Sequence, residues 1–198
     1  MNWLACLLLA LGSLHAQALP GGGAPFDWQA RWQHYLHRTY SWERLGFLAA
    51  DSAFEQLMGE PREWGRRPHS FAYRYSAGLG GRVVRNSIEL GAGAALHEDI
   101  RFRPSGARTF RGRIKYAFWQ AFTGQRDGRR AFAYSRLAGT AGGTLAISLW
   151  EPRPLTASRF FEGVGFGFAG HLQNSFLNEF SGDLKAAGRA VRRKIAGR

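Results

Sequence analysis

The chain has 198 residues, a net charge of +13 at neutral pH and one cysteine. This length allows one core of ordinary size. The cysteine is Cys6, which precedes the first charged residue, Asp27, so thiol catalysis and thiolate metal sites are excluded from the rest of the chain. The positive charge favours polyanions as partners, namely anionic lipid, lipopolysaccharide or nucleic acid.

Residues 1–18 predict a secretory signal peptide. The apolar run 3–14 is shorter than the about 20 residues that a membrane span needs, and residues 16–18 (AQA) have the form of a signal-peptidase site. An uncleaved N-terminal anchor is the alternative. Residues 19–26 are rich in glycine and proline and predict a linker. We therefore expect an exported protein of the periplasm or outer membrane, and export argues against nucleic acid as the partner.

Residues 27–184 predict a single all-α domain, a glycine-rich helix bundle with one short β-hairpin. Asp27 is a good N-cap for a helix over 28–39. Its large apolar residues recur at helical spacing, and we interpret them as the buried face: Trp28, Trp32, Tyr35, Leu36 and Tyr40. A second helix begins at Ser41 and ends at Gly59, before Pro61.

A glycine-rich stretch over 71–96 is the centre of the predicted bundle. Small residues recur there in steps of three and four, which allows two helix backbones to approach closely. Each glycine costs a helix about 1 kcal/mol, so close packing must compensate. We expect 137–149 and 160–180 to be its neighbours, and 60–70 and 97–107 to be loops.

The second half of the chain predicts three more helices and a hairpin. Thr109 caps a helix over 109–121. Its inward residues are predicted to be Phe110, Ile114, Ala117, Phe118 and Ala121, and its outward ones Arg111, Arg113 and Lys115. Asp127-Gly128 predicts a hairpin near 122–134. Ser135 caps a helix over 136–149, and a long helix then runs to about residue 181.

The last segment, 185–198, predicts a basic amphipathic helix or a disordered tail. Leu184, Val191 and Ile195 give it an apolar edge. Its candidate residues for binding an anionic surface are Lys185, Arg189, Arg192, Arg193 and Lys194.

Several short motifs occur in a definite order: 61–65 (PREWG), 73–76 (YRYS), 96–101 (LHEDIR), 113–118 (RIKYAF) before the Asp127-Gly128 turn, 132–135 (FAYS), and Asn174 with Glu179-Phe180 and Asp183. In this order the chain resembles an uncharacterised family of exported bacterial proteins, found mainly in Acidobacteria, over most of residues 35–185. It departs from the family at Ile100, Ala133 and Trp150, where the family favours Pro, Asn and an aromatic pair. The family has no established activity, so the resemblance implies fold and export and adds no mechanism.

The densest polar cluster is His97, Glu98, Asp99 and Arg101. An imidazole beside carboxylates suits general acid–base catalysis or a divalent metal. The spacing is not that of a HExxH motif, however, and adjacent side chains diverge. The structural alternative is a helix C-terminus, where His97 meets the negative end of the helix dipole and Asp99 pairs with Arg101. No segment matches a P-loop or dinucleotide fingerprint, so we predict neither a cofactor nor a metal.

Three functions compete on this sequence. The favoured hypothesis is a non-catalytic helical protein of the cell envelope that associates with anionic membrane or another polyanion. The first alternative is an enzyme centred on the cluster at 97–101. The second is a small outer-membrane β-barrel, suggested by alternating residues at 71–90 and 110–118. The sequence carries no signature of an oligomeric state.

Overall fold

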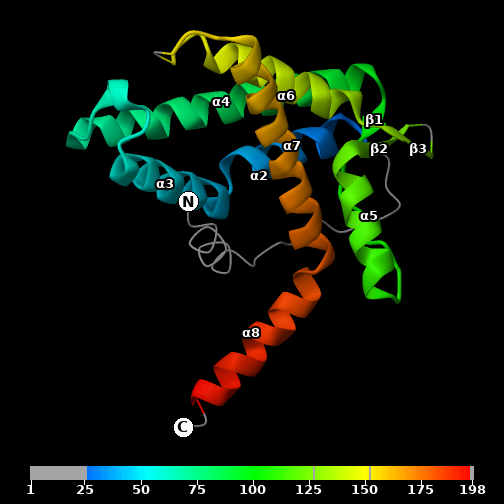
Figure 1. The fold of residues 1–198 in the computed structure, drawn as a ribbon. Helices are drawn as coiled ribbons and strands as arrows, with labels where there is room; N and C mark the ends of the chain where they lie inside the picture. Colours follow the sequence, from blue (N-terminus) through cyan, green and yellow to red (C-terminus); the bar gives the residue numbers. More distant parts are fainter. Residues whose placement is uncertain (1–25, 127, 152, 197–198) are drawn as a thin grey trace. The chain divides into compact units, whose positions relative to one another are not determined.

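A computed structural model describes residues 26–196 except 127 and 152 (Figure 1). The predicted signal peptide and nearly all of the linker lie outside these residues. The described chain is helical with one small antiparallel sheet, which confirms the predicted fold class. Its contacts divide it into a larger unit, 26–100 with 123–168, and a smaller unit, 101–122 with 169–196.

The larger unit contains most of the regular structure. Its helices are α2 (Trp28–Tyr40), α3 (Trp42–Met58), the 3₁₀ turn η1 (Arg62–Trp64), α4 (Pro68–Ala95), α6 (Tyr134–Ile147) and the first part of α7 (Ala157–Glu179). Its strands are β1 (Glu98–Asp99), β2 (Thr123–Arg126) and β3 (Arg129–Phe132). The smaller unit contains α5 (Phe110–Phe122), the rest of α7 and α8 (Ser181–Ala196).

Local signals set the helix ends. The side chain of Asp27 accepts a 2.8 Å hydrogen bond from the backbone N–H of Ala30, as an N-cap should. Gly59 ends α3 with a left-handed φ of 72°, which favours glycine. Pro68 is the first residue of α4, which therefore starts earlier than the predicted residue 71, because proline suits a first helical turn.

The predicted hairpin is present, and a third strand joins it. β2 and β3 pair antiparallel from Thr123 opposite Phe132 to Arg126 opposite Arg129. Gly128, in the turn, has a φ of 75°. β1 pairs with β2, with Glu98 opposite Arg126. We expected a loop at β1, because two residues are too few to show a strand periodicity.

Helices α4 and α6 are antiparallel and in very close contact (Figure 1). A Cβ atom added to Gly139 would lie 2.9 Å from the Cβ of Glu89 and 3.0 Å from the backbone oxygen of Arg85. One added to Gly81, near the other end of the contact, would lie 2.6 Å from Ile147. The predicted pairing of the glycine-rich stretch with 137–149 is therefore confirmed.

The first part of α7 also packs closely against α6 at glycine residues. Added Cβ atoms on Gly163 and Gly167 would lie 2.5 Å from the methyl groups of Thr144 and Thr140. Both threonine hydroxyls donate to helix carbonyls one turn back, Thr144 at 2.8 Å to Thr140 and Thr140 at 2.8 Å to Arg136. Their methyl groups are thus free to face the glycines of α7.

The interior of the larger unit is mostly polar. Arg74 is 2% exposed, and Glu89 and Glu98 are each 1% exposed. They are accompanied by small hydroxyl residues: Thr39, Ser52, Ser70, Ser135 and Thr140. In this unit the buried apolar side chains are Tyr35, Leu48, Ile100 and Ala133.

The large apolar side chains lie mainly outside, and here several sequence predictions are wrong. In the stripe of α2 that we expected to be buried, Tyr35 is buried, whereas Trp28 is 62% exposed and Trp32, Leu36 and Tyr40 are also exposed. Of the five residues of α5 that we expected to point inward, Ala117 and Ala121 are buried, whereas Phe110, Ile114 and Phe118 are exposed. On α2, the buried positions are those of Arg31, Tyr35 and Thr39.

In the smaller unit, Arg113 is also placed differently from the prediction. Its guanidinium group pairs with Glu179 at 3.1 Å and with Asp183 at 2.7 Å, and lies 4.3 Å from the ring centre of Phe180. Glu179 also accepts hydrogen bonds from the N–H and hydroxyl of Ser105. Arg113 therefore links α5 to the junction of α7 and α8 instead of facing solvent.

Within the described part of the chain, every helix is too short or too polar to cross a bilayer.

The α4–α6 contact predicts a specific sensitivity to substitution. Gly139→Ala should destabilise the protein by about 2 kcal/mol, because the new methyl group meets backbone atoms of α4 that cannot move aside. Gly165→Ala is the matched control, since a Cβ there meets nothing within 4 Å. The control should be neutral or stabilising by about 0.5–1 kcal/mol. Urea unfolding of both variants would measure the difference, and equal effects would contradict the described contact.

Candidate functional site

The predicted cluster at 97–101 is divided by the fold. His97 is exposed and has a left-handed φ of 53°. Glu98 is buried, and Asp99 is half-buried in β1. Arg101 belongs to the smaller unit, where its carbonyl accepts a hydrogen bond from Gln120. The imidazole of His97 and the carboxylate of Glu98 therefore lie in different environments and do not share one site.

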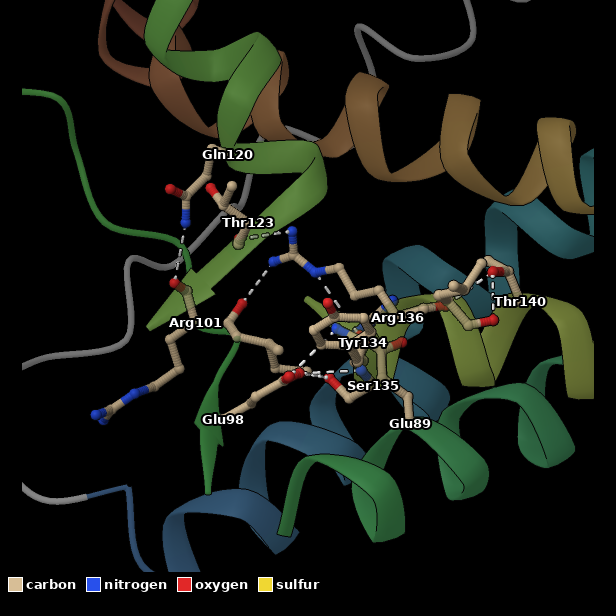
Figure 2. Close-up of polar contacts among 12 residues, drawn as sticks. Glu89, Glu98, Arg101, Gln120, Thr123, Tyr134, Ser135, Arg136 and Thr140 are labelled. Atoms are coloured by element: carbon tan, nitrogen blue, oxygen red, sulfur yellow. Dashed lines mark hydrogen bonds and ion pairs between the residues drawn. The ribbon is translucent and has the colours of Figure 1, made fainter. Parts of the chain in front are cut away.

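The carboxylate of Glu98 caps helix α6 (Figure 2). One oxygen accepts the backbone N–H of Ser135 at 3.0 Å and its hydroxyl at 2.7 Å. The other accepts the N–H of Tyr134 at 3.2 Å and pairs with Arg126 at 2.6 Å. Negative charge is favourable at a helix N-terminus. Glu98, rather than Ser135 as predicted, is therefore the cap of α6.

Two buried arginines hold the backbone of the same region. Arg31 of α2 donates to the carbonyl of Glu98 at 2.8 Å. Arg136 of α6 donates to the carbonyl of Ile100 at 2.8 Å and to that of Thr123 at 3.3 Å (Figure 2). A guanidinium group has five donors in a planar fork, so one side chain can satisfy several carbonyls. These bonds fix β1 against α2, α6 and the start of β2.

A second polar cluster lies where α2 packs against α4. Glu89 pairs with Arg38 at 2.7 Å and lies 3.9 Å from Arg136. Asn86 donates to the hydroxyl of Thr39 at 2.9 Å. Beside them is a cavity of about 20 Å³, which suits one water molecule. Its lining residues are Phe26, Arg31, His34, Tyr35, Arg38, Asn86, Glu89, Leu90 and Ile100.

His34 of this cluster has a strongly shifted pKa. Its Nδ1 atom is buried and has no hydrogen-bond partner among the described residues. Burial, together with the positive charge of Arg38, lowers the pKa of His34 to about 4. Burial likewise lowers the pKa of Arg136 to about 10, although the negative charge of Glu89 opposes this shift. At neutral pH, His34 is an uncharged side chain within a charged network.

The loop 60–67 is organised by a third buried arginine. Arg74 donates to the carbonyl of Glu60 at 2.6 Å and to that of Gly65 at 2.9 Å, and it also bonds the side chain of Gln56. Its guanidinium group lies 5.9 Å from the ring of Trp64. The conformation of this loop, which includes the PREWG motif, therefore depends on one side chain of α4.

An open groove of about 490 Å³ lies beside this loop. It is lined by Trp64, Tyr73, Ser76, Ala77, Gly80 and Trp150. The ion pair between Glu63 and Arg153, at 3.4 Å, joins the two segments that carry the tryptophans. The lining contains no carboxylate, imidazole or lysine, so the groove offers stacking surfaces rather than acid–base chemistry.

The chemistry of these clusters is that of a structural network. The carboxylate of Glu98 is occupied by helix N–H groups, a hydroxyl and Arg126, and Glu89 is paired with arginine. In the part of the chain that the structure describes, no three His, Asp or Glu side chains are placed to hold a metal ion. The full set of partners of its carboxylate favours the structural interpretation of Glu98 over the catalytic one.

Neither the buried arginines nor Glu89 is distinguished by a motif in the sequence. Arg31, Arg38, Arg74 and Arg136 resemble ordinary surface cations in the sequence. A usable signal was available in α2, where Arg31 and Arg38 are seven residues apart and flank Tyr35, so that all three lie near one helix face. Glu89 is likewise the only acidic residue of the long helix α4.

The predicted surface-binding residues all lie in α8. Lys185 is half-buried and Arg189 is exposed, and Arg192, Arg193 and Lys194 follow in the same helix. This helix contains five basic residues and one acidic residue, Asp183.

Comparisons of the chain with protein-family models, curated proteins and solved structures found no match. Its function is therefore inferred from its own residues.

Removal of the Glu98 carboxylate should destabilise the fold. Glu98→Ala leaves Arg126, the Ser135 hydroxyl and two helix N–H groups without their acceptor, which should cost about 3 kcal/mol. His97→Asn changes an exposed neighbour whose φ of 53° suits asparagine, and should stay within about 0.5 kcal/mol of the wild type. Chemical unfolding would compare the two. A stable Glu98→Ala protein would contradict the capping role.

The pKa of His34 predicts a pH-dependent stability. Between pH 6.5 and about 4, the unfolded chain binds a proton at His34 that the folded protein does not, so the folded state loses stability as the pH falls. The full loss is at most about 3 kcal/mol. Glu55, whose pKa burial and Asp51 raise to about 7, opposes this trend, so the comparison must be made between variants.

We therefore expect the wild type to lose stability relative to His34→Gln as the pH falls from 6.5 to 4. Urea unfolding over this range would measure the difference. His37→Gln, at an exposed position of α2, is the control and should leave the pH dependence unchanged. A constant difference between the wild type and His34→Gln would show that His34 is not held in its neutral form.

Proposed function

We propose that this protein is a non-catalytic helical protein of the cell envelope that associates with anionic membrane surfaces. The proposal combines an apolar exterior, a basic amphipathic helix and a high positive charge. Export to the envelope, inferred from the signal pattern of residues 1–18, is part of the same proposal.

The main support for this proposal is that charged side chains are buried while large apolar side chains are exposed. Charged groups usually lie outside a water-soluble domain and large apolar ones inside. Here Glu89, Glu98 and Arg74 are buried, whereas Trp42 is 88% exposed and Phe166 is 74% exposed. Large apolar side chains are exposed on α2, α3, α5 and α7. Extensive apolar surface of this kind marks a contact with membrane or with another protein.

Helix α8 and the net charge favour a membrane with anionic lipids over a neutral one. Leu184, Val191 and Ile195 recur at helical spacing along α8, and the five basic residues occupy other positions of the helix. A basic amphipathic helix of this kind lies in the plane of a membrane interface. The chain's charge of +13 adds attraction to acidic headgroups.

This proposal is tested by co-sedimentation of the purified protein with vesicles. We expect binding to vesicles of phosphatidylglycerol and phosphatidylcholine in equal parts, and weaker binding to phosphatidylcholine alone. The variant Arg192→Gln/Arg193→Gln/Lys194→Gln should bind the anionic vesicles roughly 100-fold more weakly at low salt, since each cation near the surface contributes about 1 kcal/mol. At about 1 M salt, where the screening length is about 3 Å, the variant and the wild type should converge.

A matched variant separates the role of α8 from that of net charge. Arg111→Gln/Lys115→Gln/Arg129→Gln removes three exposed cations at other places and gives the same net charge. It should lose much less affinity than the α8 variant. Equal losses would remove the specific role of α8, and a wild type that binds neither vesicle at any salt would refute the proposed function.

A further inference from the structure

The outer surface of α2 carries aromatic and aliphatic side chains and no permanent charge. Its exposed residues, beyond the Asp27 cap, are Trp28, Gln29, Trp32, Gln33, Leu36, His37 and Tyr40. Four of them, Trp28, Trp32, Leu36 and Tyr40, recur every fourth residue and so follow one stripe of the helix. Tryptophan and tyrosine combine an apolar ring with a polar group, which suits the boundary between headgroups and acyl chains.

The charged residues of α2 are held on its other side. Arg31 donates to the carbonyls of Phe26 and Glu98, and Arg38 pairs with Glu89 of α4. Thr39 accepts a hydrogen bond from Asn86. The helix cannot turn its aromatic stripe inward without breaking these buried bonds, so the stripe is a fixed part of the surface.

Helix α3 lies beside α2 along the same side of α4 (Figure 1). Its contacts with α4 include Leu48 against Gly78 and the carbonyl of Arg44, which accepts from Arg82 at 2.7 Å. Its exposed residues include Trp42, Phe47, Phe54, Leu57 and Met58, with Asp51 as the exposed acid. We name the exposed apolar residues of the two helices the α2–α3 surface.

Exposed arginines follow directly on this surface at the end of α3. Arg62, Arg66 and Arg67 are all exposed. Arg66 donates to the carbonyl of Met58 at 3.1 Å, and the carbonyl of Arg67 accepts from Gln56 at 2.9 Å. The same segment carries two exposed acids, Glu60 and Glu63, so its exposed charges sum to a net positive charge beside the apolar side chains. Apolar groups next to net positive charge are the arrangement of proteins that bind an acidic lipid interface.

We propose that the α2–α3 surface enters the headgroup–acyl boundary of an anionic phospholipid bilayer, with α2 and α3 in the plane of the membrane. The inference rests on the proposed membrane association and names the surface that inserts. In this proposal α8 provides electrostatic attraction, which salt weakens. The α2–α3 surface provides apolar binding, which persists at high salt. Two such signals together give stable anchoring where one gives weak binding.

Charge favours a bilayer over a second copy of the chain as the occupant of this surface. Two molecules of charge +13 repel each other, and a symmetric contact would bring two copies of the same arginines toward one interface. An anionic bilayer instead offers phosphates to Arg62, Arg66 and Arg67 and an apolar layer to the rings. The test must therefore also be able to detect a dimer formed through the α2–α3 surface.

The test compares salt-resistant vesicle binding of two triple variants in the full chain. Trp28→Gln/Trp32→Gln/Leu36→Gln changes exposed residues of α2, and its fold is checked by circular dichroism. On the anionic vesicles at about 1 M salt, it should bind about 100-fold more weakly than the wild type, since three large side chains lose their apolar environment. At low salt it should keep measurable binding through α8. The blue shift of tryptophan emission, which should accompany binding of the wild type, should be much smaller.

The control variant is Leu137→Gln/Leu145→Gln/Leu149→Gln, which changes three other exposed leucines of the same unit. It should bind like the wild type at high salt. Equal weakening of both triple variants would overturn the assignment to α2–α3, as would a wild-type level of salt-resistant binding in the α2 variant. The inference would also be overturned if sedimentation equilibrium showed a dimer that only the α2 variant dissociates, with vesicle binding unchanged. The proposed function fails separately, if the wild type binds no anionic vesicle even at low salt.

Discussion

The larger unit depends on buried guanidinium groups that donate hydrogen bonds to backbone carbonyls. Arg74 shapes the loop after α3, and Arg31 and Arg136 hold the backbone of the short strand β1. Burial of a cation is costly unless several partners compensate, and the planar fork of arginine can reach several acceptors at once. Each of these arginines therefore holds its own helix against the backbone of another segment of the chain. Few large apolar side chains are buried among the described residues of this unit. The hydrogen bonds of the arginines therefore replace much of the apolar side-chain packing of an ordinary core.

The polar interior and the apolar surface have a common origin in the small residues of α4, α6 and α7. Where Gly139 meets Glu89 or Gly167 meets Thr140, the helices are too close to accommodate a ring between them. The aromatic residues of neighbouring helices are then left on the outside, and the space near the helix ends is filled by long arginines and by hydroxyl groups. This arrangement is unfavourable in water alone, because large apolar side chains remain hydrated. A bilayer interface would relieve that hydration, and for this reason the packing and the proposed membrane association support one another.

Much of the fold could be predicted from local sequence signals. Asp27, Gly59 and Gly128 mark the ends of elements by their own backbone chemistry, and the glycine spacing in 71–96 correctly indicated the close partner helix. The orientation of the helices could not be predicted in this way. Periodicity shows that α2 has two different faces, and the usual rule places the aromatic one inside. That rule fails here because the inner face is chosen by long-range partners: Arg38 meets Glu89, and Glu98 reaches Ser135 across 37 residues. The cluster at 97–101 does contain an unusual residue, Glu98. A single sequence cannot show, however, that the carboxylate oxygens of Glu98 accept hydrogen bonds from the first N–H groups of α6.

The glycine contacts of α4 and α6 also determine how the larger unit can respond to mechanical force. Gly139, Gly142 and Gly143 form notches that receive Glu89, Ile88 and Arg85, so side chains of one helix sit in gaps of the other. Sliding one helix past the other by a turn, about 5.4 Å, would bring one of these side chains to another glycine and drive the other two against residues that carry a Cβ atom. The two helices are therefore held in one register along their axes and resist sliding past each other. Load applied at one end is transmitted along the pair without slippage, and any hinge motion must occur in the loops and helix ends around it.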